Sequence, residues 1–430
     1  MSTDALQNAL PASSSSERAP HAASPAHHAT PLRGGRMPAK ARFILSMLER
    51  LEIGHLTLRL PDGSTRSFGR GEPAAHAHIT DWAVFERAMA SGDVGFGEAY
   101  MDGQFATDDL AGLLTLLNAN RVTIERGLYG SFFGRLMYRI KHLLNRNTKS
   151  KARKNIEAHY DLGNTFYAEW LDPSMTYSSA LFDGSADQSL EQAQHAKLKR
   201  VFDRLQLREG AKVLEIGCGW GGFAELAARA GAHVTGLTLS SEQLAYARAR
   251  LSTQGLSGAT EFKLQDYRDE GHGAEPQYDG IASIEMFEAV GEEYWTSYFD
   301  CLDRNLKAGG HACIQVITIA DELFERYRDG TDFIQQYIFP GGMLPSPSRF
   351  VELAHKHGFV VEDRFAFGRD YAITLRLWHQ LFNSRREQVL AQGFDERFIR
   401  MWQFYLGYCE AGFLTGSTDV YQFTLRKAVA

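Results

Sequence analysis

The sequence predicts an α/β fold, in which a doubly wound parallel sheet follows a small, mostly helical N-terminal domain. Two observations carry this prediction. From Lys212 onward, short apolar runs alternate with stretches of helical periodicity, as in a parallel sheet with helices on both faces. The first apolar run also ends in a glycine-rich turn that leads into a helical pattern, as at the first strand of a Rossmann-like sheet.

The expected elements follow from the same periodicities. In the N-terminal domain, a helix at 41–51 precedes an alternating segment at 55–69, which predicts a hairpin with Asp62-Gly63 at its turn. In the second domain, alternating and amphipathic segments predict a sheet and its covering helices. We expect strands at 212–217, 233–239, 260–265, 278–284, 311–319, 359–367 and 420–426, and helices at 220–230, 240–254, 293–307, 371–392 and 395–412.

The chain divides into four parts. Residues 1–40 are rich in Ala, Ser, Pro and His, and we expect a disordered tail there. The N-terminal domain is expected over 41–125, a linker helix over 126–154, and the larger domain over 155–430. At 430 residues the chain is long enough for two hydrophobic cores.

Composition narrows the class of protein. No apolar run reaches the ~18 residues of a membrane-spanning helix, and the N-terminus lacks the apolar segment of a signal peptide. The four cysteines are widely spaced and show no metal-site pairing, so we expect a reducing cytoplasm and no metal. The net charge of −6 argues against bulk affinity for nucleic acid.

One stretch departs from this overall charge. No acidic residue lies between Glu125 and Glu157. Residues 126–154 combine basic residues with apolar ones at helical spacing, which is typical of an amphipathic helix on an anionic membrane surface. A linker helix that packs its apolar face on a neighbouring domain explains the pattern equally well. The basic residues are Arg126, Arg135, Arg139, Lys141, Arg146, Lys149, Lys151, Arg153 and Lys154.

The glycine-rich turn, VLEIGCGWGG (213–222), predicts a nucleotide-type cofactor. Glycines let the backbone approach a ligand closely and open a helix N-terminus toward it. A dinucleotide would need an acidic residue at the end of the next strand, but Thr238 and Ser240 stand there. The pattern E-x-G-x-G-x-G instead indicates S-adenosylmethionine (SAM) and a class I SAM methyltransferase. It comprises Glu215, Gly217, Gly219 and Gly221.

Five blocks outside this turn have counterparts in one family. They are GFGEAYMDGQF (95–105), HYDLGNTFYAEWLDPSMTYSSALF (159–182), GLTLSSEQ (236–243), IEMFEAVG (284–291) and FIQQYIFPGGMLPS (333–346). Together they resemble the cyclopropane fatty acid synthase family of SAM-dependent lipid methyltransferases. The combination is far more specific than the glycine-rich turn alone.

The resemblance implies transfer of a methylene or methyl group from SAM to the double bond of an unsaturated phospholipid acyl chain. In that chemistry the alkene attacks the sulfonium methyl, a carbocation forms on the neighbouring carbon, and a bound bicarbonate removes a proton. It further implies an N-terminal domain that docks on lipid and a peripheral location on the inner membrane surface. A homodimer is one option for the assembly. A mid-chain fatty acid methyltransferase and a methyltransferase for a soluble small molecule are the alternatives.

The resemblance also assigns residues to the SAM site. Asp266 and Tyr267 follow the third strand, where such folds hold the adenine, and Ile284 ends the fourth. Gln243 also fits a capping box with Ser240, which explains it equally well. The full set expected around SAM, beyond the glycine-rich turn, is Tyr177, Ser178, Thr238, Leu239, Gln243, Asp266, Tyr267 and Ile284.

Four residues match the family's bicarbonate site, two of them with a changed side chain. Glu288 in MFEAVG matches the glutamate that anchors bicarbonate, and Tyr337 in QQYIFPGG matches a tyrosine that contacts it. Ser179 stands where the family commonly has cysteine, and Gln315 where it commonly has histidine. Both can hydrogen-bond an anion, but glutamine cannot titrate. These changes leave a cyclopropane, a methylene and a methyl product open.

Overall fold

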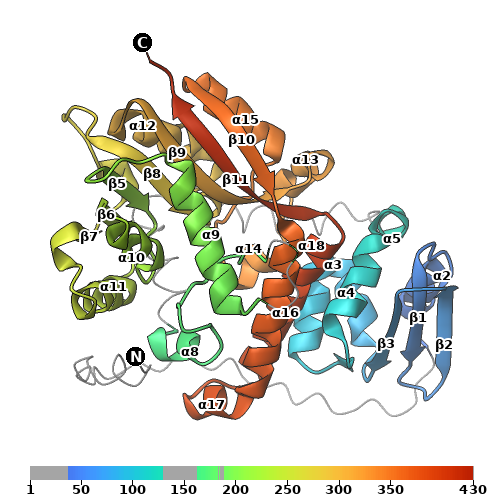
Figure 1. Cartoon of the computed structure of the whole chain (residues 1–430). Helices are drawn as coiled ribbons and strands as arrows, with labels where there is room; N and C mark the ends of the chain where they lie inside the picture. Colours follow the sequence, from blue (N-terminus) through green and yellow to red (C-terminus); the bar gives the residue numbers. More distant parts are fainter. Residues whose placement is uncertain (1–36, 129–161, 183, 185–187, 430) are drawn as a thin grey trace.

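A computed structural model describes residues 37–128, 162–182, 184 and 188–429. Its larger part is built on a seven-stranded sheet of order β10-β11-β9-β8-β5-β6-β7 (Figure 1). The strands from β5 to β9 are parallel, whereas β11 runs antiparallel between β9 and β10. The predicted doubly wound sheet is thereby confirmed. The strands are β5 (Lys212–Ile216), β6 (His233–Thr238), β7 (Thr260–Leu264), β8 (Tyr278–Ile284), β9 (Leu306–Ile319), β10 (Phe359–Ala366) and β11 (Thr418–Lys427).

Helices cover both faces of this sheet because successive side chains of a strand point to opposite faces. In β5, Val213 packs in a core with α9, α10 and α11, whereas Leu214 packs in a second core with α12 and α15. The chain leaves β5 at the centre of the sheet, where the strand order reverses and such folds bind their ligands. The helices are α9 (Leu190–Arg204), α10 (Gly222–Arg229), α11 (Ser241–Thr253), α12 (Trp295–Asn305) and α15 (Pro347–Lys356).

The N-terminal domain combines helices with a small sheet of order β2-β1-β3-β4. The predicted hairpin is confirmed, because β1 and β2 pair in antiparallel fashion. At its turn Gly63 adopts a φ of +84°, which glycine allows, and the amide of Ser64 donates to Asp62 Oδ1 at 3.0 Å. The elements are α2 (Ala39–Leu48), β1 (Gly54–Arg59), β2 (Thr65–Arg70), β3 (Ala74–Ile79), α3 (Ala83–Met101), β4 (Phe105–Ala106), α4 (Leu110–Ala119) and α5 (Arg121–Leu128).

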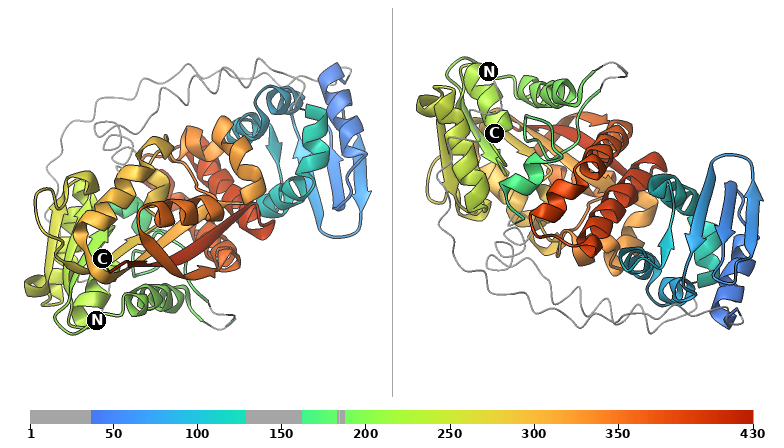
Figure 2. Two further views of the ribbon diagram at one scale, coloured as in Figure 1. Left: turned by 90° about the horizontal axis from the view of Figure 1, so that it is seen from above. Right: turned by 90° about the horizontal axis from the view of Figure 1, so that it is seen from below.

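Two long C-terminal helices lie between the sheet and the N-terminal domain (Figure 2). Helix α18 (Glu396–Leu414) packs on α16 (Gly368–Ser384) and also contacts α3 and α4. One apolar core therefore runs from Leu116 in α4 through Trp402 in α18 to Trp378 in α16. The expected helix 371–392 is divided in two, and its second part is α17 (Arg386–Ala391). The N-terminal domain is thus fixed on the catalytic part by a shared core.

Two predicted regions fall largely outside the described residues. The tail expected over 1–40 is described only from residue 37, and α2 already begins at Ala39. The basic stretch 126–154 is described only where α5 ends, at residue 128. Among the helices that are described, none is long and apolar enough to cross a membrane.

Candidate active site

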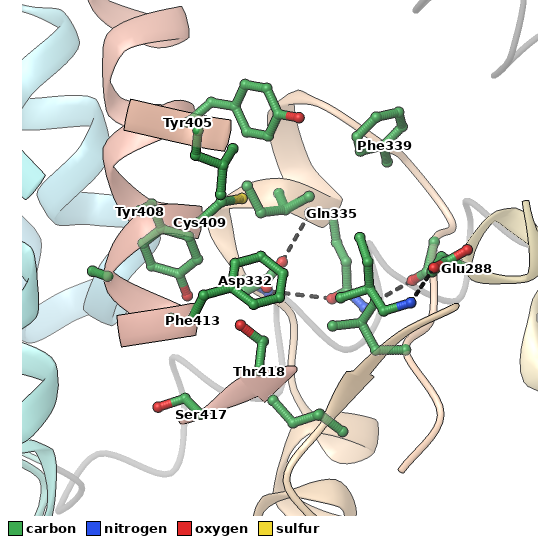
Figure 3. A pocket seen from close by; sticks show the side chains of 18 of the residues that line it. Glu288, Asp332, Gln335, Phe339, Tyr405, Tyr408, Cys409, Phe413, Ser417 and Thr418 are labelled. Carbon is green, nitrogen blue, oxygen red and sulfur yellow. Dashed lines mark hydrogen bonds between the residues drawn. The ribbon is translucent and has the colours of Figure 1, made fainter. Parts of the chain in front are cut away.

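A cavity of ≈ 1200 Å³ begins at the carboxyl ends of β5, β6 and β8 and continues into the N-terminal domain. Gly219 and Thr238 line one end, and Leu56 of β1 and Leu113 of α4 line the other. The middle of the cavity is lined by residues that α13 (Asp321–Asp329), α14 (Phe333–Tyr337), α18 and their adjoining loops contribute. Figure 3 shows Tyr405, Tyr408 and Phe413 of α18 on one side of the view and Glu288 on the other.

The glycine-rich turn leaves room for a ligand at the sheet end of this cavity. Gly217, Gly219 and Gly221 have φ values of +83°, +50° and +83°, which L side chains rarely adopt. The amides of Gly217 and Cys218 donate to the carbonyl of Leu237 at 3.0 and 2.9 Å, which anchors the turn to β6. A Cβ added at Gly219 would meet no protein atom within 4 Å, and Gly219 lines the cavity. The backbone is therefore open to the ligand there.

Glu215 provides a carboxylate that fits a polar cofactor. It lies near the carboxyl end of β5, is only 3% exposed, and lines the cavity. Its Oε2 atom has no hydrogen-bond partner among the described residues. Burial raises the pKa of this carboxyl well above its usual range. A buried acceptor of this kind suits the hydroxyls of a ribose.

The loop after β6 brings three more expected residues to the cavity. Thr238, Leu239 and Gln243 all line it. The hydroxyl of Thr238 donates to Gln243 Oε1 at 3.1 Å, so the two side chains hold each other in place. The amide of Gln243 also donates to Ser240 Oγ at 3.2 Å, which caps α11. Gln243 therefore takes part in the helix cap through its backbone and faces the cavity through its side chain.

The loop after β7 places one of its two expected residues in the cavity wall. Tyr267 lines the cavity, and its hydroxyl is buried without a hydrogen-bond partner among the described residues. Asp266 does not line the cavity in this structure, where its carboxylate binds the Arg268 guanidinium at 2.8 and 2.6 Å, so its contact with the cofactor stays a prediction. Gln265, which the sequence analysis did not single out, lines the cavity instead.

Three further predicted residues lie around the same end. Ile284, at the end of β8, lines the cavity. Tyr177 and Ser178 also line it, with the Tyr177 hydroxyl 2.7 Å from the hydroxyl of Tyr405. Lys197 of α9 donates to Ser178 Oγ at 2.5 Å. Burial lowers the pKa of Lys197 to about 8, although nearby carboxylates act in the opposite direction.

Glu288 lies on the cavity wall in a one-turn helix, Phe287–Ala289. Its Oε1 atom accepts a hydrogen bond from the amide of Ile317, and its Oε2 atom has no partner among the described residues. Burial and the charge of Glu285 raise the pKa of this carboxyl well above its usual range. Glu288 is therefore set up as a neutral acid with one free oxygen.

Ser179 and Gln315 both contact a residue that the sequence analysis missed, Glu285. The amide of Ser179 and the Nε2 atom of Gln315 donate to Glu285 Oε1 at 2.9 and 2.7 Å. The hydroxyl of Tyr371, in α16, donates to Glu285 Oε2 at 2.6 Å. Ser179 and Gln315 are fully buried and do not line the cavity, whereas Glu285 and Tyr371 do. The sequence does contain a signal for Glu285, because it is an acidic residue directly after a predicted strand.

These contacts bear on whether bicarbonate fits. The hydroxyl of Ser179 donates to the carbonyl of Ala180 at 3.0 Å, and Gln315 Oε1 accepts from Gln422 at 3.0 Å. The amide of Ser179 and the side-chain amide of Gln315 are already bonded to Glu285. Two of the four residues expected at the bicarbonate site, Ser179 and Gln315, are therefore engaged by a protein carboxylate, and they do not fit the ion.

Tyr337 lies away from these residues, so its contact with the anion site stays a prediction. Its hydroxyl donates to Glu98 Oε1 in α3 at 2.6 Å, and it does not line the cavity. Its ring stacks on Phe333 with 5.0 Å between centroids, so this face of α14 turns toward the N-terminal domain. Tyr371 supplies the tyrosine hydroxyl at the cavity instead.

The sheet order and the open glycine-rich turn at β5 define a class I SAM methyltransferase. Coclaurine N-methyltransferase bound to N-methylheliamine and S-adenosylhomocysteine shares this fold, with a TM-score of 0.59 at 18% identity over 78% of this chain and 99% of that one. The chain belongs to the mycolic acid cyclopropane synthetase family, whose model matches residues 147–423. It is thus a SAM-dependent enzyme of a lipid-modifying family.

Two curated relatives cover most of the chain. Tuberculostearic acid methyltransferase UfaA1 of Mycobacterium tuberculosis is 38% identical over 91% of this chain and 92% of its own length. Cyclopropane-fatty-acyl-phospholipid synthase of Escherichia coli is 36% identical over 84% of this chain and 90% of its own. Among solved structures, mycolic acid cyclopropane synthase CmaA1 complexed with SAH and CTAB has a TM-score of 0.59 at 32% identity, over 64% of this chain and 98% of that one.

Proposed function

We propose that this protein transfers a one-carbon group from SAM to the double bond of an unsaturated phospholipid acyl chain. The observation that carries the proposal is the cavity of ≈ 1200 Å³ that runs from the glycine-rich turn into the N-terminal domain. Pockets for small ligands usually measure about 300–1,000 Å³. A larger cavity that extends well beyond the SAM end favours a long second ligand over a soluble small molecule.

The far section of the cavity has the chemistry of an acyl-chain site. Its wall is apolar and comes from several elements of the N-terminal domain, so a chain lying there would be shielded from water. Each buried methylene contributes about 0.8 kcal/mol to binding. The apolar residues that line this section include Leu56, Leu58, Ile79, Phe85, Leu113 and Leu117.

The middle section suits a reaction that passes through a cation. When bound, SAM supplies an electrophilic methyl group. Around the place where the acyl chain would meet it, Tyr177, Tyr371 and Tyr405 line the cavity, and aromatic faces stabilise nearby positive charge. Apolar side chains around the reacting carbon would also limit access of water, which quenches a carbocation.

A cyclopropane is the first candidate product, because a curated relative that covers most of this chain is named as a cyclopropane-fatty-acyl-phospholipid synthase. A methylene branch is the second candidate. It is favoured by the similarity to tuberculostearic acid methyltransferase UfaA1 and by Gln315, which cannot take up a proton. Conversion of the methylene branch into a methyl branch would require a separate reductant.

Proton NMR of phospholipid vesicles after incubation with the purified protein and SAM tests the proposal. Upfield ring-methylene signals are expected for a cyclopropane, and vinylidene signals would establish the second candidate. The two products have the same mass, so NMR is needed to separate them. If neither signal appears while SAM still binds, the phospholipid substrate is wrong.

We further propose that the protein docks peripherally on an anionic, inner membrane surface through the basic stretch 126–154. The support is its nine Lys and Arg residues without an acidic one. Each cation contributes about 1 kcal/mol near anionic lipid. More of the protein should sediment with anionic vesicles than with neutral vesicles. Equal binding to both would mean that the basic stretch does not dock the protein on anionic lipid.

A further inference from the structure

We propose that the carboxylate of Glu285 is a built-in proton acceptor, which makes the enzyme independent of bicarbonate. This inference rests on the proposed function and names the base for it. Glu285 stands on the cavity wall in front of Ser179 and Gln315, the two changed residues at which the family resemblance places bicarbonate contacts. A side chain thus replaces a diffusible anion.

The surroundings of Glu285 hold an oriented anion. Its two oxygens accept three hydrogen bonds, from the amide of Ser179, from Gln315 Nε2 and from the hydroxyl of Tyr371, at 2.9, 2.7 and 2.6 Å. Hydrogen bonds to a charged group are stronger than those to a neutral group and fix its direction. Burial raises the pKa of Glu285, whereas the charge of the buried Lys197 ammonium acts in the opposite direction and favours the carboxylate.

The backbone at Glu285 points to a specific requirement for this side chain. Its φ is +49°, in the left-handed region where glycine is favoured and where an L residue is strained. Strained residues of this kind cluster at functional sites. The amide of Glu285 donates to the carbonyl of Gln315 at 2.8 Å, which helps to hold the strained turn. A carboxylate is thereby presented where glycine would fit the backbone better.

Glu285 and Glu288 differ in protonation state. Both line the cavity, and the charge of Glu285 disfavours ionisation of Glu288. Glu285 has three donors and a lysine, whereas Glu288 has one donor, from Ile317, and an unpartnered oxygen. Glu285 is therefore the anion of the pair and Glu288 the neutral acid.

The step balances without another reactant. An alkene carbon of the lipid forms a bond to the sulfonium methyl as the carbon–sulfur bond breaks, and a cation remains on the neighbouring alkene carbon. Glu285 removes a proton from the new methyl carbon, and the electron pair of that C–H bond closes the third bond of the ring. For a methylene product, a hydride first shifts between the two former alkene carbons, and the same proton loss then forms the new double bond. In both cases the proton passes from Glu285 to water.

Turnover of two variants in buffer depleted of bicarbonate tests the proposal. The wild-type rate is expected to be the same with and without bicarbonate. Glu285→Gln should lower kcat by about 100-fold or more, because a positioned base contributes about 10²–10⁴-fold, while SAM affinity stays unchanged. Glu285→Gly fits the backbone and opens the space, so added bicarbonate should restore part of its turnover.

A control and a binding measurement complete the design. Glu410→Gln removes another buried carboxylate, one that pairs with Arg376 outside the cavity, and it should leave kcat unchanged. In ¹³C NMR with labelled bicarbonate and SAH-loaded protein, the glycine variant should bind the ion and the wild type should not. A wild type that binds or requires bicarbonate, or a Glu285→Gln variant within about threefold of it, would overturn the proposal. Failure of the proposed function would show separately, as no lipid product from the wild type, and the bicarbonate-binding result would still decide the role of Glu285.

Discussion

Two regions of the reaction cavity are built from different kinds of sequence information. We call them the cofactor end, at the glycine-rich turn, and the proton-accepting end, at Glu285 after β8. At the cofactor end, Glu215, the glycine-rich turn and Gln243 lie within one strand–helix–strand–helix segment. At the proton-accepting end, Glu285 binds Ser179, which is 106 residues away in sequence, and Tyr371, which is 86 residues away. A local motif can specify the first end, but only the folded chain assembles the second.

The difference also concerns how each end uses backbone strain. At the cofactor end, positive φ angles fall on Gly217, Gly219 and Gly221, where they cost little. At the proton-accepting end the positive φ falls on Glu285, where it costs stability. At the cofactor end, glycines without side chains leave room for a ligand. At the proton-accepting end, a strained backbone places a reactive carboxylate on the cavity wall.

After the Glu285 variants, removal of the Tyr371 hydroxyl at the proton-accepting end should have the largest effect on kcat. Tyr371→Phe deletes a hydrogen bond to the Glu285 carboxylate, and such bonds to charged groups contribute about 1.5–3 kcal/mol, or roughly 10–150-fold. We expect kcat to fall within that range while KM for SAM is unchanged, because Tyr371 acts by positioning Glu285. Tyr421→Phe, on β11 outside the cavity, is the matched control. An equal loss in both variants would contradict a specific role.

A methyl group at the cofactor end should act on binding instead. Gly219→Ala places a Cβ in the open space of the cavity and should weaken SAM binding about tenfold or more, as measured by calorimetry. Gly255→Ala has the same kind of positive φ and an equally open surrounding, but it follows α11 outside the cavity. Both should lose about 1 kcal/mol of folding stability from backbone strain. Equal SAM affinity in the two variants would show that the turn does not approach the cofactor.

These two ends explain how much could be predicted from the sequence. The sheet, its helices and the cofactor end followed from periodicity and a contiguous motif, and Gly219, Thr238 and Gln243 do line the cavity. The place of Asp266 could not be predicted, because a strand-end carboxylate can face a ligand or bind an arginine two residues away, and here it binds Arg268. The direction of Tyr337 could not be predicted either, because the orientation of a one-turn helix depends on the helix beside it, α3.

The pH dependence of turnover should separate the ends further. Burial disfavours the ionised form of Glu285, and the charge of Lys197 favours it. Lys197→Met removes the favourable charge, so the pKa of Glu285 rises and the acid limb of the kcat profile moves to higher pH. Lys199→Met is the control, because Lys199 lies on the same helix but is exposed and pairs with Asp203. An unshifted acid limb in Lys197→Met would mean that Glu285 does not set it.

The smallest effect on turnover is expected at Tyr337. Tyr337→Phe removes its hydrogen bond to Glu98, which joins α14 to the N-terminal domain, and should cost about 1 kcal/mol of folding stability. Because the hydroxyl points away from the cavity, kcat should stay within about twofold of the wild type, in contrast to Tyr371→Phe. Thermal unfolding and turnover measured on the same preparations separate the two effects. A large loss of kcat without a loss of stability would instead mean that Tyr337 acts at the proton-accepting end. In that case α14 would have to turn during the reaction.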